Sequence, residues 1–262
     1  GGRFSYRFVS ESGERSKSYA CPLARRAGLR LLDVRQCGDG FWSVYETDTL
    51  EIGLKIELFP CIRLIFTTNL NVKIDDNNAN SQHISREYEL EADEGRLRLK
   101  RRGRVLFELG GQLEALVSEG GAMELGFELR LPGRAAYGFG EKFDRVDQAG
   151  LKPLNYVVEQ YSHQQDKSYL PVPFMFTDAG VSFLQRGFSR SLFDLGGGTD
   201  GRMLTARISC RCQAGERLYE ALINEGSPAE LIRAYTEETG APALPPDWAF
   251  GPWISSNGWN TQ

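Results

Sequence analysis

Two cysteines one residue apart are the first side chains in this sequence that could do chemistry. In an extended strand, side chains two positions apart point to the same face, so Cys210 and Cys212 could offer two thiolates to one metal ion. A metal site needs further ligands, and the two histidines, His83 and His163, lie far away in the sequence. We therefore interpret the pair as small buried side chains and predict no metal and no cofactor.

A glycine run offers a second candidate. Residues 196–201 match the spacing G-x-G-x-x-G of dinucleotide-binding loops. Such a loop opens a helix, whereas residues 203–208 alternate between apolar and polar side chains as a strand does. The glycines are therefore predicted to turn a hairpin.

A group of carboxylates is the third candidate. Glu141, Asp144 and Asp147 lie within seven positions of one another. Acid–base catalysis needs carboxyl groups held at a fixed separation on rigid elements, and these three share one flexible segment. We interpret Glu141 as a structural residue that braces its turn through an ion pair or a bond to the backbone.

The elements that must position these groups are mostly strands. Apolar and polar residues alternate with a period of two, which predicts half-buried antiparallel strands over 41–47, 50–57, 62–66, 123–131, 181–185, 190–195, 203–212 and 217–223. The basic cluster 96–104 follows the same alternation, so it is predicted to form two strands joined at an Arg-Gly turn, with the charges facing water. Residues 75–81 read as a polar loop, and residues 1–28 as a frayed end or an edge strand.

One helix is predicted late in the chain. Ser227, Pro228 and Glu230 provide an N-cap serine, a proline in the first turn and a glutamate that completes a capping box. Gly240 is predicted to end this helix. Many strands, one late helix and no alternation of strands with helices predict a mainly β protein, a large two-sheet β-sandwich over residues 1–240.

Composition excludes several classes of protein. The 262 residues carry 31 basic and 35 acidic side chains, a net charge of −4, so we expect no nucleic-acid partner. No apolar run approaches the length of a membrane span, so we expect no membrane partner. The five cysteines are odd in number and irregularly spaced, which favours a reducing, cytoplasmic location. A homo-oligomer is compatible with all of these observations.

The last stretch indicates that the chain is the front part of a larger protein. After Gly240 comes a stiff segment with three prolines, and then the apolar run 249–254, which resembles the start of a buried strand. A buried parallel strand needs neighbours on both edges, and the sequence ends within ten residues. Residues 241–262 are therefore predicted to be a linker followed by the first strand of an incomplete domain.

Three motifs in the same order resemble glycoside hydrolase family 31, which comprises α-glucosidases and α-xylosidases. These are YGFGEKF at 137–143, YLPVPFMF at 169–176 and PALPPDWAFGPWISSNGW at 242–259. The resemblance implies that residues 1–240 form a galactose-mutarotase-like supersandwich. It also implies that residues 241–262 contain the first strand of a (β/α)8 catalytic barrel.

The resemblance further implies where a sugar would bind. Both catalytic aspartates of the family lie on later barrel strands, so no catalytic residue is assigned here. In the family a loop of the sandwich reaches the sugar bound beyond the cleavage point, and the matching run places Tyr161, Gln164 and Asp166 there. Gln164 stands about where the family usually has an aspartate, which puts the leaving-group specificity in doubt. A solvated loop is the alternative interpretation.

Three more candidates lie in the predicted barrel strand and just after it. Trp253, Asn257 and Trp259 would be near the end of the strand at which barrel active sites form, although both tryptophans could equally be core or interface residues.

The resulting expectation is the N-terminal domain of a retaining α-glycosidase that hydrolyses α-glucosides or α-xylosides. Its partners would be an oligosaccharide or α-glycoside substrate and the missing catalytic barrel of the same polypeptide, and the chain alone would be inactive. Two alternatives remain. One is a stand-alone, non-catalytic carbohydrate-binding sandwich, and the other is a structural β-domain used in oligomer contacts.

Overall fold

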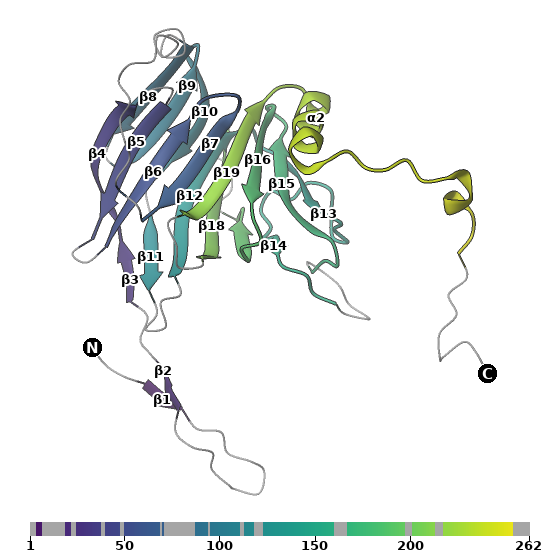
Figure 1. Ribbon diagram of the computed structural model, residues 1–262, viewed down its shortest axis with the longest axis horizontal. Coiled ribbons are helices and arrows are strands. Elements are labelled where there is room, and N and C mark those ends of the chain that lie inside the picture. Colours follow the sequence, from purple (N-terminus) through teal and green to yellow (C-terminus); the bar gives the residue numbers. More distant parts are fainter. Residues whose placement is uncertain are drawn as a thin grey trace, which may run out of the picture.

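Two large antiparallel sheets form the body of the protein (Figure 1). The structure is a computed structural model and describes residues 4–6, 19–21, 25–37, 40–47, 50–68, 70, 87–93, 95–110, 113–117, 123–159, 167–196, 201–212 and 217–253. Within these residues the predicted mainly β, two-sheet architecture with a single α-helix is confirmed.

The first sheet has eight strands. Their order is β13 (Ala136–Gly140), β15 (Pro171–Thr177), β16 (Val181–Arg186), β19 (Arg217–Glu225), β7 (Ile62–Thr67), β6 (Glu51–Glu57), β5 (Gly40–Glu46) and β4 (Arg30–Cys37). Five of the alternating segments predicted from the sequence are consecutive neighbours in this sheet: 181–185, 217–223, 62–66, 50–57 and 41–47.

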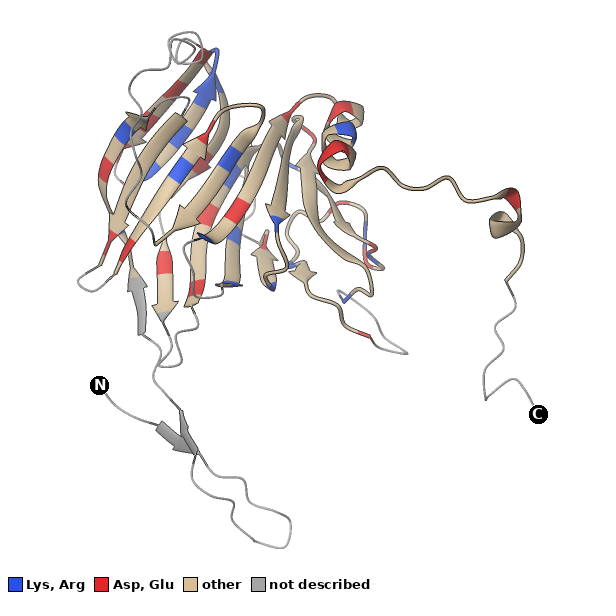
Figure 2. Cartoon of the chain, in the orientation of Figure 1, with Lys and Arg blue, Asp and Glu red and all other residues tan. Residues whose placement is uncertain are grey.

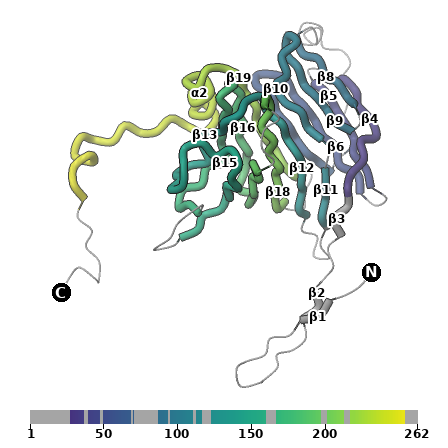
Figure 3. The backbone as a smooth tube through the Cα atoms, turned by 180° about the vertical axis from the view of Figure 1, so that it is seen from behind, coloured from purple at the N-terminus to yellow at the C-terminus, as the bar shows by residue number. Residues whose placement is uncertain are grey.

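The second sheet has nine strands. Seven follow the order β14 (Leu154–Asn155), β17 (Ser191–Asp194), β18 (Met203–Cys212), β12 (Met123–Pro132), β10 (Arg104–Leu109), β9 (Arg96–Arg101) and β8 (Tyr88–Asp93). β11 (Glu114–Val117) pairs with β12 and with β3 (Arg25–Gly28). The strands β1 (Phe4–Tyr6) and β2 (Tyr19–Cys21) pair with each other in a separate two-stranded sheet. Figure 3 shows the two large sheets from behind.

The core lies between the two sheets. Phe66 of β7 stacks on Phe127 of β12 with ring centroids 5.0 Å apart, and Tyr219 of β19 meets both rings edge-on. Strict alternation along β12 turns Met123, Leu125, Phe127, Leu129 and Leu131 inward. Because a period of two places every second side chain on one face, the sequence pattern alone determines which side of β12 is buried.

The basic cluster is a hairpin, as predicted. β9 and β10 are joined by Arg102 and Gly103, whose φ angles of 49° and 79° suit the two-residue turn that matches the twist of paired strands. Figure 2 shows Lys and Arg (blue) and Asp and Glu (red) along the strands of both sheets. Arg98 bonds Glu108 at 2.7 Å, and Glu108 in turn accepts from Arg130 at 2.9 Å.

The indole ring of Trp42 packs closely against the backbone of β6 because position 53 is a glycine. A Cβ atom on Gly53 would come within 2.2 Å of the indole ring. The ring fills this space and is only 6% exposed.

The helix α2 (Pro228–Thr239) begins and ends as predicted. The Ser227 hydroxyl accepts the Glu230 backbone N–H at 3.4 Å, and the Glu230 carboxylate accepts the Ser227 N–H at 2.7 Å. Gly240, with φ 99°, ends the helix. Buried Leu231 faces the sheet, and Tyr235 packs on Phe174 of β15 with centroids 4.6 Å apart.

After α2 the chain leaves the sandwich as an extended arm (Figure 1). Asp247–Phe250 form the 3-10 helix η1, which includes the first two residues of the apolar run in which a strand was predicted. Residues 254–262 lie outside the described residues, so the first barrel strand and the boundary at residue 240 stay predictions. The polar loop at 75–81 and most of the glycine run at 196–201 also lie outside them.

Candidate functional site

The candidate site is the connection between β14 and β15, which we call the rim loop, residues 156–170. Its two ends are held together by a parallel bridge between Val157 and Ser168, and the Val158 N–H donates to the Ser168 carbonyl at 3.0 Å. Tyr161, Gln164 and Asp166 lie between these ends, in the part of the loop outside the described residues. The structure therefore fixes where this loop leaves the sandwich.

Ser168 anchors the returning end of the rim loop. Its side chain is buried, and its hydroxyl accepts the Leu170 N–H at 3.0 Å. The backbone carbonyl of Leu170 in turn accepts the Glu141 N–H at 3.1 Å. The rim loop is thereby tied to the motif at 137–143.

That motif is a strand with a bulge, not a simple turn. Gly138 and Gly140 of β13 pair with β15, and the register shifts between them. A Cβ atom at Gly138 would lie 2.4 Å from the Phe174 carbonyl oxygen, and one at Gly140 would lie 2.0 Å from the Leu170 carbonyl oxygen. Both glycines are therefore required by close backbone approach.

The segment that follows the bulge, residues 141–153, crosses from one sheet to the other and is held by its own polar side chains. Asp147 accepts the backbone N–H groups of Ala136 and Ala149 at 3.0 and 2.9 Å. Burial works against the Asp144 carboxylate, but donation from the Arg145 N–H and from the Gln148 amide outweighs it and lowers the pKa of Asp144. These bonds are structural, and they occupy two of the three carboxylates considered from the sequence.

Glu141 does not brace the turn through its side chain. Its carboxylate lies at the surface, and among the described residues it has no hydrogen-bond or ion-pair partner. The backbone N–H bond to Leu170 supplies the brace instead. The expectation of a structural role therefore holds for the backbone of this residue and not for its side chain.

Two of the aromatic groups that are open to solvent are Tyr156, in the rim loop, and Trp253, at the end of the arm (Figure 1). Tyr156 is 51% exposed and lies beneath the Arg190 guanidinium, 4.7 Å from the ring centroid. Trp253 is 73% exposed, and its indole N–H donates to the Ala249 carbonyl at 2.9 Å. Asn257 and Trp259 lie outside the described residues. Sequence analysis missed Tyr156, because it is a single aromatic residue in a segment without periodic pattern.

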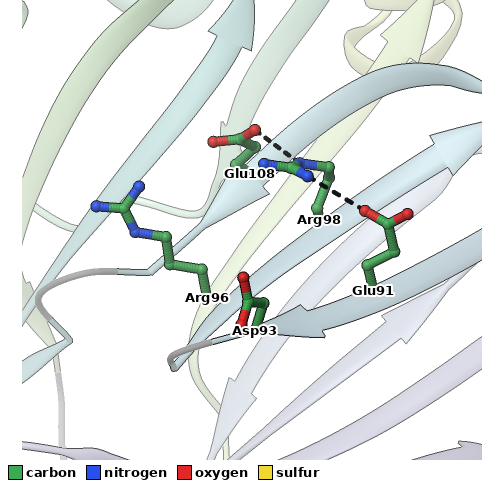
Figure 4. Close-up of a pocket in the computed structure, with 5 residues that line it drawn as sticks. All are labelled: Glu91, Asp93, Arg96, Arg98 and Glu108. Atoms are coloured by element: carbon green, nitrogen blue, oxygen red, sulfur yellow. Dashed lines mark hydrogen bonds and ion pairs between the residues drawn. The ribbon is translucent and has the colours of Figure 1, made fainter.

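A charged hollow of about 130 Å³ lies on the outer face of β8, β9 and β10 (Figure 4). Arg98 is held between Glu91 at 3.2 Å and Glu108 at 2.7 Å, beside Asp93 and Arg96. None of the five lining side chains is aromatic, so the hollow lacks the flat apolar surface on which sugar rings pack. It is part of the ladder of ion pairs that covers this sheet.

Cys210 and Cys212 face the core together, as predicted. Both are 2% exposed, and their Sγ atoms are 3.4 Å apart. The hydrogen bond with the Cys210 thiol lowers the pKa of Cys212. The described residues contain no group of three or more metal-ligating side chains. In the same part of the chain no helix has the length and hydropathy to cross a bilayer.

Comparison with known families identifies the fold. The family model described as "Glycosyl hydrolase 31 N-terminal galactose mutarotase-like domain" matches residues 43–194, more than half of the chain. The chain belongs to this family. This membership confirms the resemblance drawn from the three motifs and the predicted supersandwich.

Individual relatives agree with the family. The 1,3-alpha-isomaltosidase of Kribbella flavida is 33% identical over 157 residues, which cover 57% of this chain and 21% of the relative. The alpha-xylosidase XylQ of Lactiplantibacillus pentosus is 26% identical over 125 residues, or 46% of this chain and 15% of the relative. The matched part of the chain thus spans about a fifth of the isomaltosidase.

A solved structure shows the same fold. The cycloalternan-forming enzyme from Listeria monocytogenes, in complex with a pentasaccharide substrate, superposes with a TM-score of 0.63 at 16% identity. The match covers 98% of this glycosyl hydrolase 31 domain and 27% of that enzyme.

Proposed function

We propose that this glycosyl hydrolase 31 domain is the N-terminal sandwich of a retaining glycoside hydrolase acting on α-glucosides or α-xylosides. The observation that carries the proposal is the family match over residues 43–194. The names of two relatives, a 1,3-alpha-isomaltosidase and an alpha-xylosidase, support this substrate class.

We further propose that the rim loop forms one wall of the substrate pocket. Support comes from its fixed base, because the bridge at Val157 and Ser168 brings both ends of the loop to the same end of the sandwich. A loop anchored on a rigid scaffold can present side chains to a ligand with little ordering cost. Tyr161, Gln164 and Asp166 would then contact the sugar that leaves. Trp253, Asn257 and Trp259 are proposed to line the pocket from the segment after the linker.

The bond-breaking groups are proposed to belong to the polypeptide beyond this chain. A retaining mechanism needs two carboxyl groups about 5 to 5.5 Å apart, one as nucleophile and one as acid and base. Of the sandwich carboxylates considered above, Asp147 accepts two backbone N–H groups. Glu141 has no carboxylate beside it that could act as its catalytic partner among the described residues. We assign no catalytic residue and no cofactor to the sandwich.

The test is made in the full-length enzyme with two kinds of substrate. If Gln164 bonds the leaving-group sugar, Gln164→Ala should lower kcat/KM for a disaccharide such as isomaltose by about 1 to 2 kcal/mol, because a buried partner is left unpaired. An activated aryl α-glycoside offers no such bond and should react nearly as before. Gln165→Ala is the matched control, and we expect it to leave both rates unchanged.

Each other result has a definite meaning. Equal losses on both substrates would place the effect in the fold or in the attacked-sugar subsite. An unchanged kcat/KM on both substrates would indicate that the rim loop is a solvated connection that does not contact the sugar. A full-length enzyme without activity on α-glucosides and α-xylosides would contradict the proposed function itself.

A stand-alone carbohydrate-binding sandwich is the second candidate. The exposed rings of Tyr156 and Trp253 favour it, since sugars stack on accessible aromatic faces. Calorimetric titration of the 262-residue chain with isomaltose and with a xylose oligosaccharide distinguishes the two. Binding that Tyr156→Ala abolishes would support this second candidate.

A further inference from the structure

A hollow of about 260 Å³ lies between the first sheet and α2, and we call it the α2 hollow. No residue of the rim loop lines it. Its apolar lining comes from the sheet and consists of Val172, Pro173 and Leu184. Its polar lining comes from the end of β16 and the last turn of α2 and consists of Gln185, Arg186, Tyr235, Glu238 and Thr239. The α2 hollow thus joins an apolar surface to a set of groups that can form hydrogen bonds.

The sequence of α2 explains why this space is not filled. Four residues spaced by three or four positions share the helix face that lies toward the sheet: Leu231, Tyr235, Glu238 and Thr239. A helix that only packed on the sheet would carry apolar side chains along the whole of this face. Here its last turn presents a carboxylate and a hydroxyl group, and Gly187, which also lines the hollow, has no side chain. The packing therefore ends at Tyr235.

The two charged groups of the α2 hollow are held in fixed positions. The Arg186 guanidinium donates to the Glu220 carboxylate at 3.2 Å and pairs with the Glu238 carboxylate at 2.9 Å. Glu220 is 6% exposed and also accepts from Arg217 at 2.6 Å, so a buried and well-bonded carboxylate orients Arg186. A guanidinium has more N–H groups, and a carboxylate more lone pairs, than these bonds use. Arg186 and Glu238 therefore keep capacity to bind a ligand.

Tyr235 adds an aromatic ring whose position is also fixed. It packs on Phe174 with ring centroids 4.6 Å apart, and it lines the α2 hollow as well. Among the described residues its hydroxyl group has no hydrogen-bond partner. The Thr239 hydroxyl donates to the Tyr235 carbonyl at 2.8 Å, and its oxygen can still accept a bond. The last turn of α2 thus offers one ring and two hydroxyl groups.

This combination suits a neutral ligand with many hydroxyl groups. One guanidinium and one carboxylate leave the lining without net charge, so it does not favour an ion of either sign. A sugar ring has a C–H face that packs on aromatic and apolar side chains, and its hydroxyl groups bond to fixed polar groups at the edge. The volume is below the range of about 300 to 1,000 Å³ for drug-sized ligands, which favours a single ring. The charged hollow of Figure 4 has no aromatic lining and does not share these properties.

We propose that the α2 hollow is a second carbohydrate-binding site, which holds one ring of an α-linked glucose oligosaccharide apart from the rim loop. Tyr235 and the apolar lining contact the C–H face of the ring, and Arg186 and Glu238 bond its hydroxyl groups. The site holds a sugar chain on the sandwich and takes no part in bond cleavage. This inference rests on the proposed function only for the choice of α-linked glucose.

The test is a chemical-shift titration of the isotope-labelled 262-residue chain with isomaltose. The backbone amides of residues 186–187 and 235–239 should shift and reach saturation, because they line the α2 hollow. The amides of Val157 and Ser168, at the base of the rim loop, report on the other proposed sugar contact. Inorganic sulfate, titrated in the same way, should not shift the amides of the α2 hollow.

Two variants remove the proposed contacts and keep most of the packing. Tyr235→Leu keeps an apolar contact with Phe174 and loses the ring, and Glu238→Ala removes a carboxylate from the exposed end of the helix. Each should weaken isomaltose binding by about tenfold. Glu237→Ala is the matched control, because it removes the neighbouring exposed carboxylate of α2, which does not line the hollow. It should leave the affinity unchanged. If Tyr235→Leu unfolds the helix, Glu238→Ala alone decides the result.

Several outcomes would overturn the proposal. The absence of any shift at residues 186–187 and 235–239, up to the solubility limit of isomaltose, would show that the α2 hollow binds no sugar. Shifts confined to the base of the rim loop would assign the sugar to that loop alone. Shifts with sulfate in place of isomaltose would make the hollow an anion site. Equal losses of affinity in Glu238→Ala and Glu237→Ala would exclude a direct contact with Glu238. None of these measurements needs turnover, so an inactive full-length enzyme would contradict the proposed function and leave this test intact.

Discussion

At the scale of single residues, the start of α2 depends on one hydroxyl group. Ser227→Ala removes the acceptor for the Glu230 N–H and leaves an amide of the first turn unpaired. We expect a loss of about 1 kcal/mol in the free energy of unfolding, measured as a lower denaturation midpoint in urea. Ser227→Thr keeps the acceptor and should recover most of that loss. An unchanged midpoint in the alanine variant would show that the cap contributes nothing.

A second prediction at this scale concerns how the stability of the protein changes at low pH. The ion pair with Lys152, at 2.8 Å, and the Gly196 N–H lower the pKa of Asp194 below its usual range. A carboxylate whose pKa is lower in the folded state stabilises the protein above its unfolded pKa of about 3.9, and this contribution is lost as the pH falls through the folded value.

In the Asp194→Asn variant the free energy of unfolding should therefore decrease less between pH 5 and pH 2 than in the unmodified protein. Urea unfolding at each pH measures this difference. Lys152→Met should act in the same direction, since it removes the first cause of the shift. A pH profile that neither variant changes would assign the acid sensitivity to other carboxylates.

At the scale of elements, most strands were predictable because alternation is a local signal. The turn at Arg102 and Gly103 and both ends of α2 were predictable for the same reason, since the residues that fix them are adjacent in the sequence. The bulge in β13 was not. Its conformation is enforced by Leu170, Phe174 and Phe193, which are 30 to 55 positions away, so nothing within 137–143 reveals it.

The same contrast holds for the candidate site. Three motifs located the rim loop and the linker, but Tyr161, Gln164, Asp166, Asn257 and Trp259 fall outside the described residues, so their roles stay predictions. Glu141 was judged from its sequence neighbours. Its lack of a partner depends on where the bulge points it, which only the folded backbone determines.

The bulge yields the element-scale prediction. Gly140→Ala and Gly201→Ala both place a Cβ atom at positive φ, 82° and 89°, but only at position 140 would it meet a carbonyl oxygen, 2.0 Å away. Gly201→Ala should cost about 1 kcal/mol from backbone strain alone. Gly140→Ala should cost at least about 2 kcal/mol, because β13 must separate from β15. Similar denaturation midpoints for the two variants would mean that the β13–β15 pairing yields easily.

At the scale of the whole molecule, three connections between the two sheets gather at one end of the sandwich. Residues 141–153, residues 156–170 and the turn at 187–190 all run between the two sheets at the end formed by β13, β14 and β17. The rim loop lies at this end. The exposed aromatic Tyr156 does as well.

The whole-molecule prediction is that the 262-residue chain, although folded, does not hydrolyse aryl α-glucosides or α-xylosides. The carboxyl groups that supply most of the rate in a retaining mechanism are proposed to lie outside it. A continuous assay of released aryl alcohol, run beside the full-length enzyme, measures this. Turnover that persists after every described carboxylate except Glu141 is replaced would contradict both this prediction and the interpretation of Glu141 as a structural residue.

The buried indole that packs against Gly53 has a consequence for the fluorescence of the protein. Trp42 is 6% exposed and should emit at short wavelength and resist acrylamide, whereas Trp248 and Trp253 on the arm are 70 and 73% exposed and should be quenched freely. With Trp259 replaced by phenylalanine, the blue-shifted component reports whether the sandwich is intact, and the quenchable component reports whether the arm is covered. A single fluorescence titration can thus separate unfolding of the sandwich from undocking of its linker.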